Sequence, residues 1–257
     1  MFLTNSMIGL AMMPQTLAAL PEDWDSALAI VAHPDDLEYG AASAVARWTG
    51  QGKRVVYTMV TSGEAGIDGM TPEQAGPLRE AEELASAAVV GVDVVEFLGG
   101  ADGMLEYDLA MRRTLSATIR RHRPDVVVTA NFRETFGPGR LNQADHVAVG
   151  RAVLDAARDA GNRWVFRDLL DEGLEPWNGV RAVLAAGSPQ ATHAVDVTDT
   201  LHRGVESLRA HEAYLAGLGV DVDPEEFLES LARMTGTVFG TKFAVSFECF
   251  PLRDFDS

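Results

Sequence analysis

The stretch AIVAHPDD, residues 29–36, joins a short apolar run directly to an imidazole and two adjacent carboxylates. The apolar half predicts a buried strand, because short continuous apolar runs are typical of strands covered on both faces. Burying His33, Asp35 and Asp36 without partners would be costly. A cation held by His33 and Asp36 would remove that cost and leave Asp35 free as a base. The alternative interpretation is a turn in which Asp caps the following helix.

Strands and helices alternate along the first two thirds of the chain. The expected strands cover residues 28–31, 54–60, 92–98 and 125–130, and the expected helices cover 40–49, 77–90, 108–121 and 147–160. Apolar strands that alternate with helices predict an α/β fold, with a parallel sheet covered on both faces. Further strands near 180–186, 193–197 and 243–250, and helices near 201–218 and 224–234, predict a C-terminal elaboration.

The domain organisation follows from length and composition. No linker rich in Pro, Gly or Ser divides the 257 residues, so we expect one domain at 25–257, preceded by an N-terminal extension at 1–24. Residues 1–20 contain no Lys or Arg and include Pro14, a pattern that fits neither a signal peptide nor a membrane span.

The net charge and the cysteine count limit the classes of binding partner and the cellular compartment that we expect. The net charge of −17, from 38 acidic and 21 basic residues, argues against nucleic acid or an anionic membrane as the main partner. The single cysteine, Cys249, excludes an internal disulfide, so a reducing, cytoplasmic location is expected. The oligomeric state cannot be predicted from these features.

Polar clusters follow each of the first four expected strands. They comprise residues 33–36, 61–66 and 99–103 and a loop at 131–142 that leads to Gln143, Asp145 and His146 at a helix start. Ligands bind beyond the carboxyl ends of the strands in open parallel sheets, so these clusters are expected to meet at one edge.

His146 is the natural third ligand for a cation at this edge. Together with His33 and Asp36 it would supply two imidazoles and one carboxylate, which leaves one position open as in a catalytic zinc site. Zn²⁺ would acidify a water molecule, and Asp35 could accept its proton. Taken alone, Asp145 is more simply interpreted as a helix cap.

At these residues the sequence resembles the LmbE-like, or PIG-L, family of zinc-dependent N-deacetylases, including its actinobacterial N-acetylglucosaminyl deacetylases. The low lysine count, with only Lys53 and Lys242, also suggests a GC-rich bacterial source. The motifs that carry the resemblance are AHPDD at 32–36 with Gly40, TSGEAG at 61–66, Arg79 with Glu82, and Asp145-His146.

The resemblance implies a Rossmann-like three-layer sandwich, the LmbE-like fold. It implies Zn²⁺ bound by His33, Asp36 and His146, with Asp35 as general base. It further implies that Arg79 contacts the substrate and that Asp102 holds a sugar hydroxyl. A helix-surface charge for Arg79 and a turn residue for Asp102 are the alternatives.

The late family motif, His-Pro-Asp-His, is only half present. Asp145 and His146 match it, and Asp145 is carried over as a catalytic residue, but Gln143 stands in place of the first His. Gln can donate a hydrogen bond to an oxyanion but cannot deliver a proton near neutral pH. We therefore expect either that Asp35 returns the proton or that His193 takes part, although His193 could equally be a strand-edge residue.

These residues favour a metal-dependent amide hydrolase that removes an acetyl group from a small N-acetylated amino-sugar conjugate, or cleaves a related amide. A metal-containing sugar-binding or regulatory protein that has lost catalysis is the alternative, supported by Gln143. A nucleotide-binding Rossmann protein fits less well, because no Gly-x-Gly-x-x-Gly follows the first strand.

Overall fold

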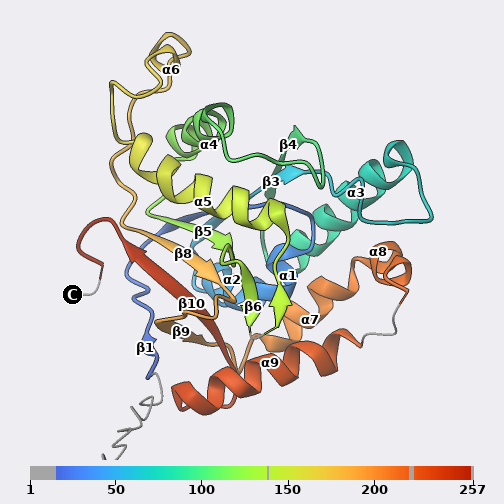
Figure 1. The fold of residues 1–257 in the computed structure, drawn as a ribbon. Coiled ribbons are helices and arrows are strands. Elements are labelled where there is room, and N and C mark those ends of the chain that lie inside the picture. Colours follow the sequence, from blue (N-terminus) through green and yellow to red (C-terminus); the bar gives the residue numbers. More distant parts are fainter. Residues whose placement is uncertain (1–15, 138, 220–222, 256–257) are drawn as a thin grey trace, which may run out of the picture.

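A computed structural model of the chain describes residues 16–137, 139–219 and 223–255. Within these residues the main sheet contains eight strands in the order β1-β9-β10-β8-β5-β2-β3-β4 (Figure 1). Their bounds, in that order, are Ala18–Ala19, His193–Asp196, Ala244–Pro251, Ala182–Ala186, Val126–Ala130, Ser26–Val31, Arg54–Thr61 and Val94–Gly100. The five strands from β8 to β4 are mutually parallel, and β10 is antiparallel to both of its neighbours. The expected mostly parallel sheet is confirmed.

Helices cover both faces of this sheet, which gives three layers (Figure 1). Helices α4 (Leu109–His122) and α5 (Ala144–Asp159) pack together on one face. The other face carries α1 (Asp36–Gly40), α2 (Ala42–Gly50), α3 (Pro72–Val89), α7 (Leu201–Arg209) and α9 (Pro224–Phe239). The shorter helices are α6 (Asp168–Asp171) and α8 (Glu212–Gly217), and β6 (Thr135–Gly137) pairs with β7 (Arg140–Leu141).

Strand β2 lies inside the sheet and contributes to two hydrophobic cores. Ala29 and Val31 belong to the core on the α2 and α7 side, whereas Leu28 and Ile30 belong to the core beneath α4 and α5. Both faces of the strand are therefore buried, which is why it shows a continuous apolar run rather than alternation.

Three boundaries differ from the sequence-based expectations. Residues 1–15 of the expected extension lie outside the described residues, but β1 pairs with β9, and Leu20 and Trp24 are buried, so the domain begins before residue 25. Helix α3 starts at Pro72 rather than at 77, because Thr71 forms a capping box with Gln74. The helix expected at 201–218 is divided into α7 and α8.

The connections place the carboxyl end of β2 at a topological switch point. From β2 the chain first adds β3 and β4 on one side, and then adds β5 and β8 on the other. Open parallel sheets bind ligands in the crevice at such a point. Residues 33–36 follow β2 directly, so the fold places them in that crevice.

Candidate metal centre and active site

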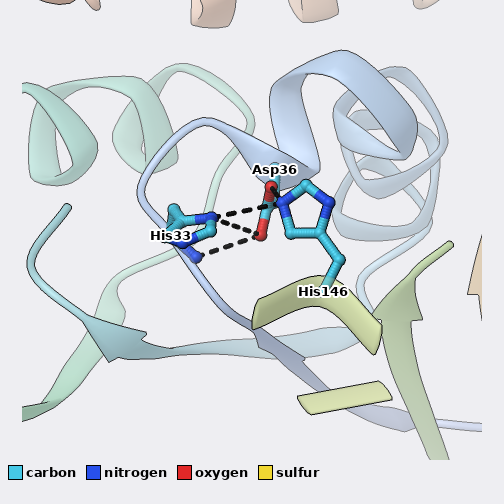
Figure 2. A group of neighbouring side chains, drawn as sticks. All are labelled: His33, Asp36 and His146. Carbon is cyan, nitrogen blue, oxygen red and sulfur yellow. Dashed lines mark hydrogen bonds and ion pairs between the residues drawn. The ribbon is translucent and has the colours of Figure 1, made fainter. Parts of the chain in front are cut away.

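His33, Asp36 and His146 converge at the carboxyl edge of the sheet (Figure 2). His33 Nδ1 lies 3.2 Å from His146 Nε2. Asp36 Oδ1 lies 2.8 Å from His146 Nε2, and Asp36 Oδ2 lies 3.7 Å from His33 Nδ1. His33 comes from the turn after β2, Asp36 is the first residue of α1, and His146 comes from the first turn of α5, so packing of α5 on the sheet assembles the trio.

The hydrogen bonds behind the two imidazoles determine their tautomers. Asn142 donates both amide protons to backbone carbonyls, so its Oδ1 must accept from His146 Nδ1 at 2.8 Å. His33 Nε2 faces Asp102 Oδ1 at 3.0 Å and Asp145 Oδ2 at 3.3 Å, and therefore carries the proton of that ring. In these tautomers His33 Nδ1 and His146 Nε2 are the nitrogens free to bind a cation, and both lie next to one another and to Asp36.

This donor set fits a divalent cation. Two imidazole nitrogens and a carboxylate directed at one point need a positive charge among them, which protons or a bound cation can supply. Donors bound to Zn²⁺ at 2.0–2.1 Å in a tetrahedral arrangement lie about 3.3 Å apart, close to the 2.8–3.7 Å separations seen here. Two His and one carboxylate leave a fourth position open, as catalytic zinc sites do.

The carboxylate of Asp36 has a fixed orientation and charge. Its Oδ2 accepts the backbone N–H groups of Ala32 and His33, both at 3.0 Å, which leaves Oδ1 directed at the centre. Burial raises the pKa of Asp36, but hydrogen bonds and charge from His146 and His33 outweigh that effect and hold this pKa well below its ordinary value. Asp36 is therefore a ready anionic ligand.

Asp102 and Asp145 both face His33 rather than the centre itself. Asp102 Oδ2 accepts the N–H of Ala65, and Asp145 accepts those of Gly103 and Leu105. Burial lowers the pKa of the His33 imidazole, but hydrogen bonds that its ring donates to the carboxylates of Asp102, Asp145 and Asp36 raise it to about 12. This carboxylate-rich setting favours positive charge on or beside His33. The sequence suggested a helix cap or a catalytic residue for Asp145; in the structure its carboxylate lies beside His33 Nε2 and accepts the N–H groups of Gly103 and Leu105.

Asn142 is a functional residue that the sequence analysis missed. Only 7% of its surface is exposed, and it holds His146 through the hydrogen bond described above. It lies four residues before His146, across the start of α5, and no motif marks it. Outer-shell partners of this kind set the tautomer and orientation of a ligating His.

Replacing Asn142 with Ala is expected to weaken metal binding by about 10–100-fold, because His146 would lose the acceptor that fixes its tautomer. A competition titration with a metal indicator dye measures this change. Asn162→Ala, in the turn after α5, is the control. Unchanged metal affinity in Asn142→Ala would contradict the outer-shell role.

Asp35 lies beside the ligands and is held in an unusual backbone conformation. Its φ is +100°, in the left-handed region that non-Gly residues rarely adopt, and its N–H points to Glu83 Oε2 at 3.3 Å. Its carboxylate pairs with Arg79 at 3.2 Å and accepts a hydrogen bond from Tyr214. Burial raises the pKa of Asp35 to about 6, against the lowering effect of Arg79. A carboxyl group with this pKa suits a general base near neutral pH.

Arg79 is buried and holds this side of the site together. Its guanidinium donates to the carbonyls of Pro34 and Gly63 and lies 4.1 Å from the ring centroid of Tyr214. A Cβ atom on Gly63 or Gly66 would lie 2.4 Å from Arg79 Nη1, which explains both glycines of the TSGEAG loop. Arg79 also lines the cavity, so its contact with substrate stays a prediction beside its observed contact with Asp35.

A second buried group lies behind Asp35. Glu38, Glu83 and His211 are at most 2% exposed, and Glu83 Oε2 lies 3.6 Å from His211 Nε2. Burial raises the pKa of both carboxyl groups and lowers that of the imidazole, so each tends towards its neutral form. Through Glu83 this cluster supports the backbone of Asp35. Sequence reasoning did not bring these residues together, because they come from three separate helical segments.

The structure separates the two residues expected to assist the oxyanion. Gln143 precedes α5 as its N-cap residue and lines the same cavity as His33 and His146. His193 starts β9, and three strands separate β9 from β2, a span of about 19 Å at ~4.8 Å per strand. Its Nδ1 lies 2.8 Å from the Thr192 hydroxyl, and it does not occur among the described residues that line the cavity. The expectation that His193 takes part is corrected accordingly.

The candidate metal site opens into a cavity of about 730 Å³. The Asp35, Arg79, Asp102, Asn131 and Gln143 side chains line its polar end together with the three ligands. Its volume is within the ~300–1,000 Å³ typical of small-molecule sites. Across the described part of the chain, no helix is both long enough and apolar enough to cross a membrane.

Comparison with known proteins identifies relatives of this arrangement. The profile of the GlcNAc-PI de-N-acetylase (PIG-L) family matches residues 28–157, which include most of β2, Asp35 and all three candidate ligands. Diacetylchitobiose deacetylase of Thermococcus kodakarensis is 28% identical over 233 residues, covering 89% of this chain and 84% of that protein.

Two solved structures share the fold. An N,N'-diacetylchitobiose deacetylase from Pyrococcus horikoshii superimposes with a TM-score of 0.79 at 23% identity, covering 91% of this chain and 89% of that one. The 4-carboxy-2-hydroxymuconate hydratase GalB from Pseudomonas putida superimposes with a TM-score of 0.72 at 17% identity, covering 91% and 99%. The fold therefore hosts more than one reaction, and the site must decide between them.

Proposed function

Because this chain belongs to the PIG-L (GlcNAc-PI de-N-acetylase) family, we propose that it is a zinc-dependent amide hydrolase that removes an N-acetyl group from a small amino-sugar conjugate. One observation carries the proposal. His33 Nδ1 and His146 Nε2 converge with Asp36 on one point, and the carboxylate of Asp35 lies next to it. A Lewis acid beside a general base, in a cavity open to small molecules, suits hydrolysis of an unactivated amide.

The proposed mechanism assigns proton transfer to Asp35. A bound Zn²⁺ lowers the pKa of water and polarises a carbonyl oxygen. Asp35 accepts the proton of the attacking water, and Arg79 and Tyr214 hold its carboxylate in position. Once the C–N bond breaks, the leaving amine needs a proton. Because Gln143 cannot supply one, Asp35 returns the proton that it accepted.

The remaining residues position the reacting groups. Gln143 would donate its amide N–H to the developing oxyanion, a contact worth about 10²–10³ in rate where such donors have been removed. Asp102 and Asp145 would orient His33 through its Nε2, as outer-shell carboxylates do. The resemblance assigned Asp102 to a sugar hydroxyl; its Oδ1 beside His33 supports an orienting role in addition.

The proposal predicts that the purified protein contains about one Zn²⁺ per chain and releases acetate from N-acetylated amino sugars such as N,N'-diacetylchitobiose. A chelator should abolish release, because the cation would supply both the acidified water and the main polarisation of the carbonyl, and added Zn²⁺ should restore it. Metal analysis and an acetate assay measure the two quantities. Zn²⁺ binding without release from any N-acetylated sugar would favour instead the non-catalytic sugar-binding protein that Gln143 suggests.

A further inference from the structure

One face of helix α3 lies behind the proposed general base. Arg79, Glu82 and Glu83 are buried and occupy positions i, i+3 and i+4 of this helix, so they share that face. Arg79 pairs with the carboxylate of Asp35, Glu82 accepts the N–H of Ala213 in α8, and Glu83 reaches the backbone of Asp35. We propose that Glu83 is a positioning residue, which holds the backbone conformation that presents the base to the metal site. The inference rests on the proposed function, since it concerns how the base of that reaction is kept in place.

The backbone of Asp35 adopts a conformation that needs support. Its φ of +100° lies in a region that residues with a Cβ atom rarely adopt. A residue persists there only when the surrounding structure imposes the conformation. Gly would adopt it without strain, but Gly has no carboxylate and could not serve as the base. Contacts from elsewhere in the chain therefore have to hold this turn.

Glu83 supplies such a contact. Its Oε2 accepts the N–H of Asp35 at 3.3 Å, and within the described residues this N–H has no other acceptor. Asp35 is 5% exposed and Glu83 is fully buried, so water has little access to the bond. Without the Glu83 carboxylate the N–H would be buried and unpaired, which is costly. A change of φ at Asp35 would relieve that cost and would turn the base away from the cation.

The rest of the buried group fixes Glu83 itself. Its Oε2 lies 3.6 Å from His211 Nε2, and the same nitrogen lies 3.8 Å from Glu38 Oε2. Glu38 accepts hydrogen bonds from the hydroxyls of Ser86 and Ser207. These side chains come from α1, α3, α7 and the start of α8, and each is at most 2% exposed. Tight packing among four helical segments therefore leaves Glu83 little freedom.

Two kinds of variant separate the hydrogen bond of Glu83 from its volume. Glu83→Gln keeps an oxygen that accepts the Asp35 N–H, whereas Glu83→Met keeps the length of the side chain and removes the acceptor. We expect kcat to fall at least about ten-fold in Glu83→Met, because misplaced reacting groups lose rate steeply, with KM and Zn²⁺ content unchanged. Glu83→Gln should retain most of kcat.

Glu83→Ala is the second variant without an acceptor and should show the same fall in kcat. Glu73→Gln, at an exposed position of the same helix, is the control and should leave kcat and KM unchanged. Equal losses of kcat in Glu83→Gln and Glu83→Met would overturn the inference, because the hydrogen bond would then not be the cause.

Metal analysis of the same variants excludes a different role for this group. Glu38, Glu83 and His211 lie close enough together to share a cation, and neither ring nitrogen of His211 has a hydrogen-bond partner. A positioning role requires the same metal content in the unaltered protein and in Glu83→Met. A second equivalent of metal that is lost in Glu83→Met would assign the group to a cation and overturn the inference.

A double-mutant cycle tests whether Glu83 acts through Asp35. In the Asp35→Asn background, Glu83→Met should cause little further loss of kcat, because the base that it positions is already gone. A further loss as large as that in the unaltered background would overturn the positioning role.

Amide hydrogen exchange, followed by NMR, separates this inference from the proposed reaction. The amide of Asp35 should exchange at least about ten-fold faster in Glu83→Met than in the unaltered protein, whereas Glu83→Gln should retain the protection. Equal protection in all three proteins would overturn the inference even if no N-acetylated sugar is hydrolysed. Faster exchange in Glu83→Met, without hydrolysis by the unaltered protein, would uphold the contact and count against the proposed function alone.

Discussion

Asp35→Asn is expected to lose nearly all turnover while keeping its metal. General bases contribute about 10²–10⁴ in rate, and Asn matches Asp in size but cannot accept the proton of the attacking water. The ligands His33, Asp36 and His146 are untouched, and each has its own hydrogen-bonded support. In this variant the metal content should therefore match that of the unaltered protein, whereas kcat at saturating Zn²⁺ should be nearly lost.

The pH dependence provides an independent check on the same residue. A base acts only when deprotonated, so kcat/KM should fall as the pH drops through the pKa of Asp35. Burial raises this pKa to about 6, and the charge of a bound cation lowers it, so the midpoint should lie at or below pH 6. Any residual kcat/KM of Asp35→Asn should not show this fall at low pH.

Asp93→Asn is the matched control, because Asp93 is an exposed carboxylate between α3 and β4, remote from the motifs. It should retain full activity and the same fall of kcat/KM at low pH as the unaltered protein. Full activity in Asp35→Asn would refute the mechanism, whatever the state of the metal site.

His146→Ala is expected to lose the metal itself. The variant removes one of three protein donors and leaves Asp36 Oδ1 and His33 Nδ1 facing an empty space. The loss of affinity should exceed the ~10–100-fold cost of removing an outer-shell partner. Metal analysis after dialysis should show substoichiometric Zn²⁺, and turnover should fall in parallel.

His202→Ala, on the exposed face of α7, should bind metal as the unaltered protein does. If His146→Ala retained Zn²⁺ with unchanged affinity, the assigned ligand set would be incorrect. Excess Zn²⁺ should restore part of the activity of His146→Ala, because Asp35 and the other two ligands remain in place.

The sequence predicted the sheet and the edge at which the site lies. The seven expected strands all correspond to observed strands, because continuous apolar runs bounded by Gly, Pro and charged residues have few other solutions. It did not predict the β6–β7 hairpin inside the loop at 131–142, whose short strands carry no apolar alternation. The domain also begins before residue 25, the expected start, because the two-residue strand β1 leaves no periodic signal in the sequence.

The site was only partly predictable, and His193 and Asn142 show why. His193 is an imidazole at the start of a late strand, and its sequence position does not show how far that strand lies from the first one. The order of strands β9, β10, β8 and β5 places it far from β2 instead. Asn142 has no sequence signal, yet its Oδ1 determines which nitrogen of His146 faces the centre. Strand order and side-chain direction both depend on packing between distant segments.

The buried surroundings of Asp35 were equally inaccessible to sequence reasoning. Arg79 looked like a substrate contact, and its ion pair with Asp35 appears only when α3 packs behind the turn after β2. Glu83 and His211 lie 48 and 176 residues from Asp35 along the chain, and the fold brings Glu83 to its backbone N–H and His211 to Glu83.

By itself, the sequence determined the α/β class, the strand that carries AHPDD, and the residue types able to bind a cation and move a proton. These are local properties, set by apolar periodicity and by the chemistry of adjacent side chains. Only the tertiary structure decided which nitrogens face the centre and how Asp35 is held. Those depend on contacts between segments that lie far apart in the chain, whose geometry is settled by packing rather than by pattern.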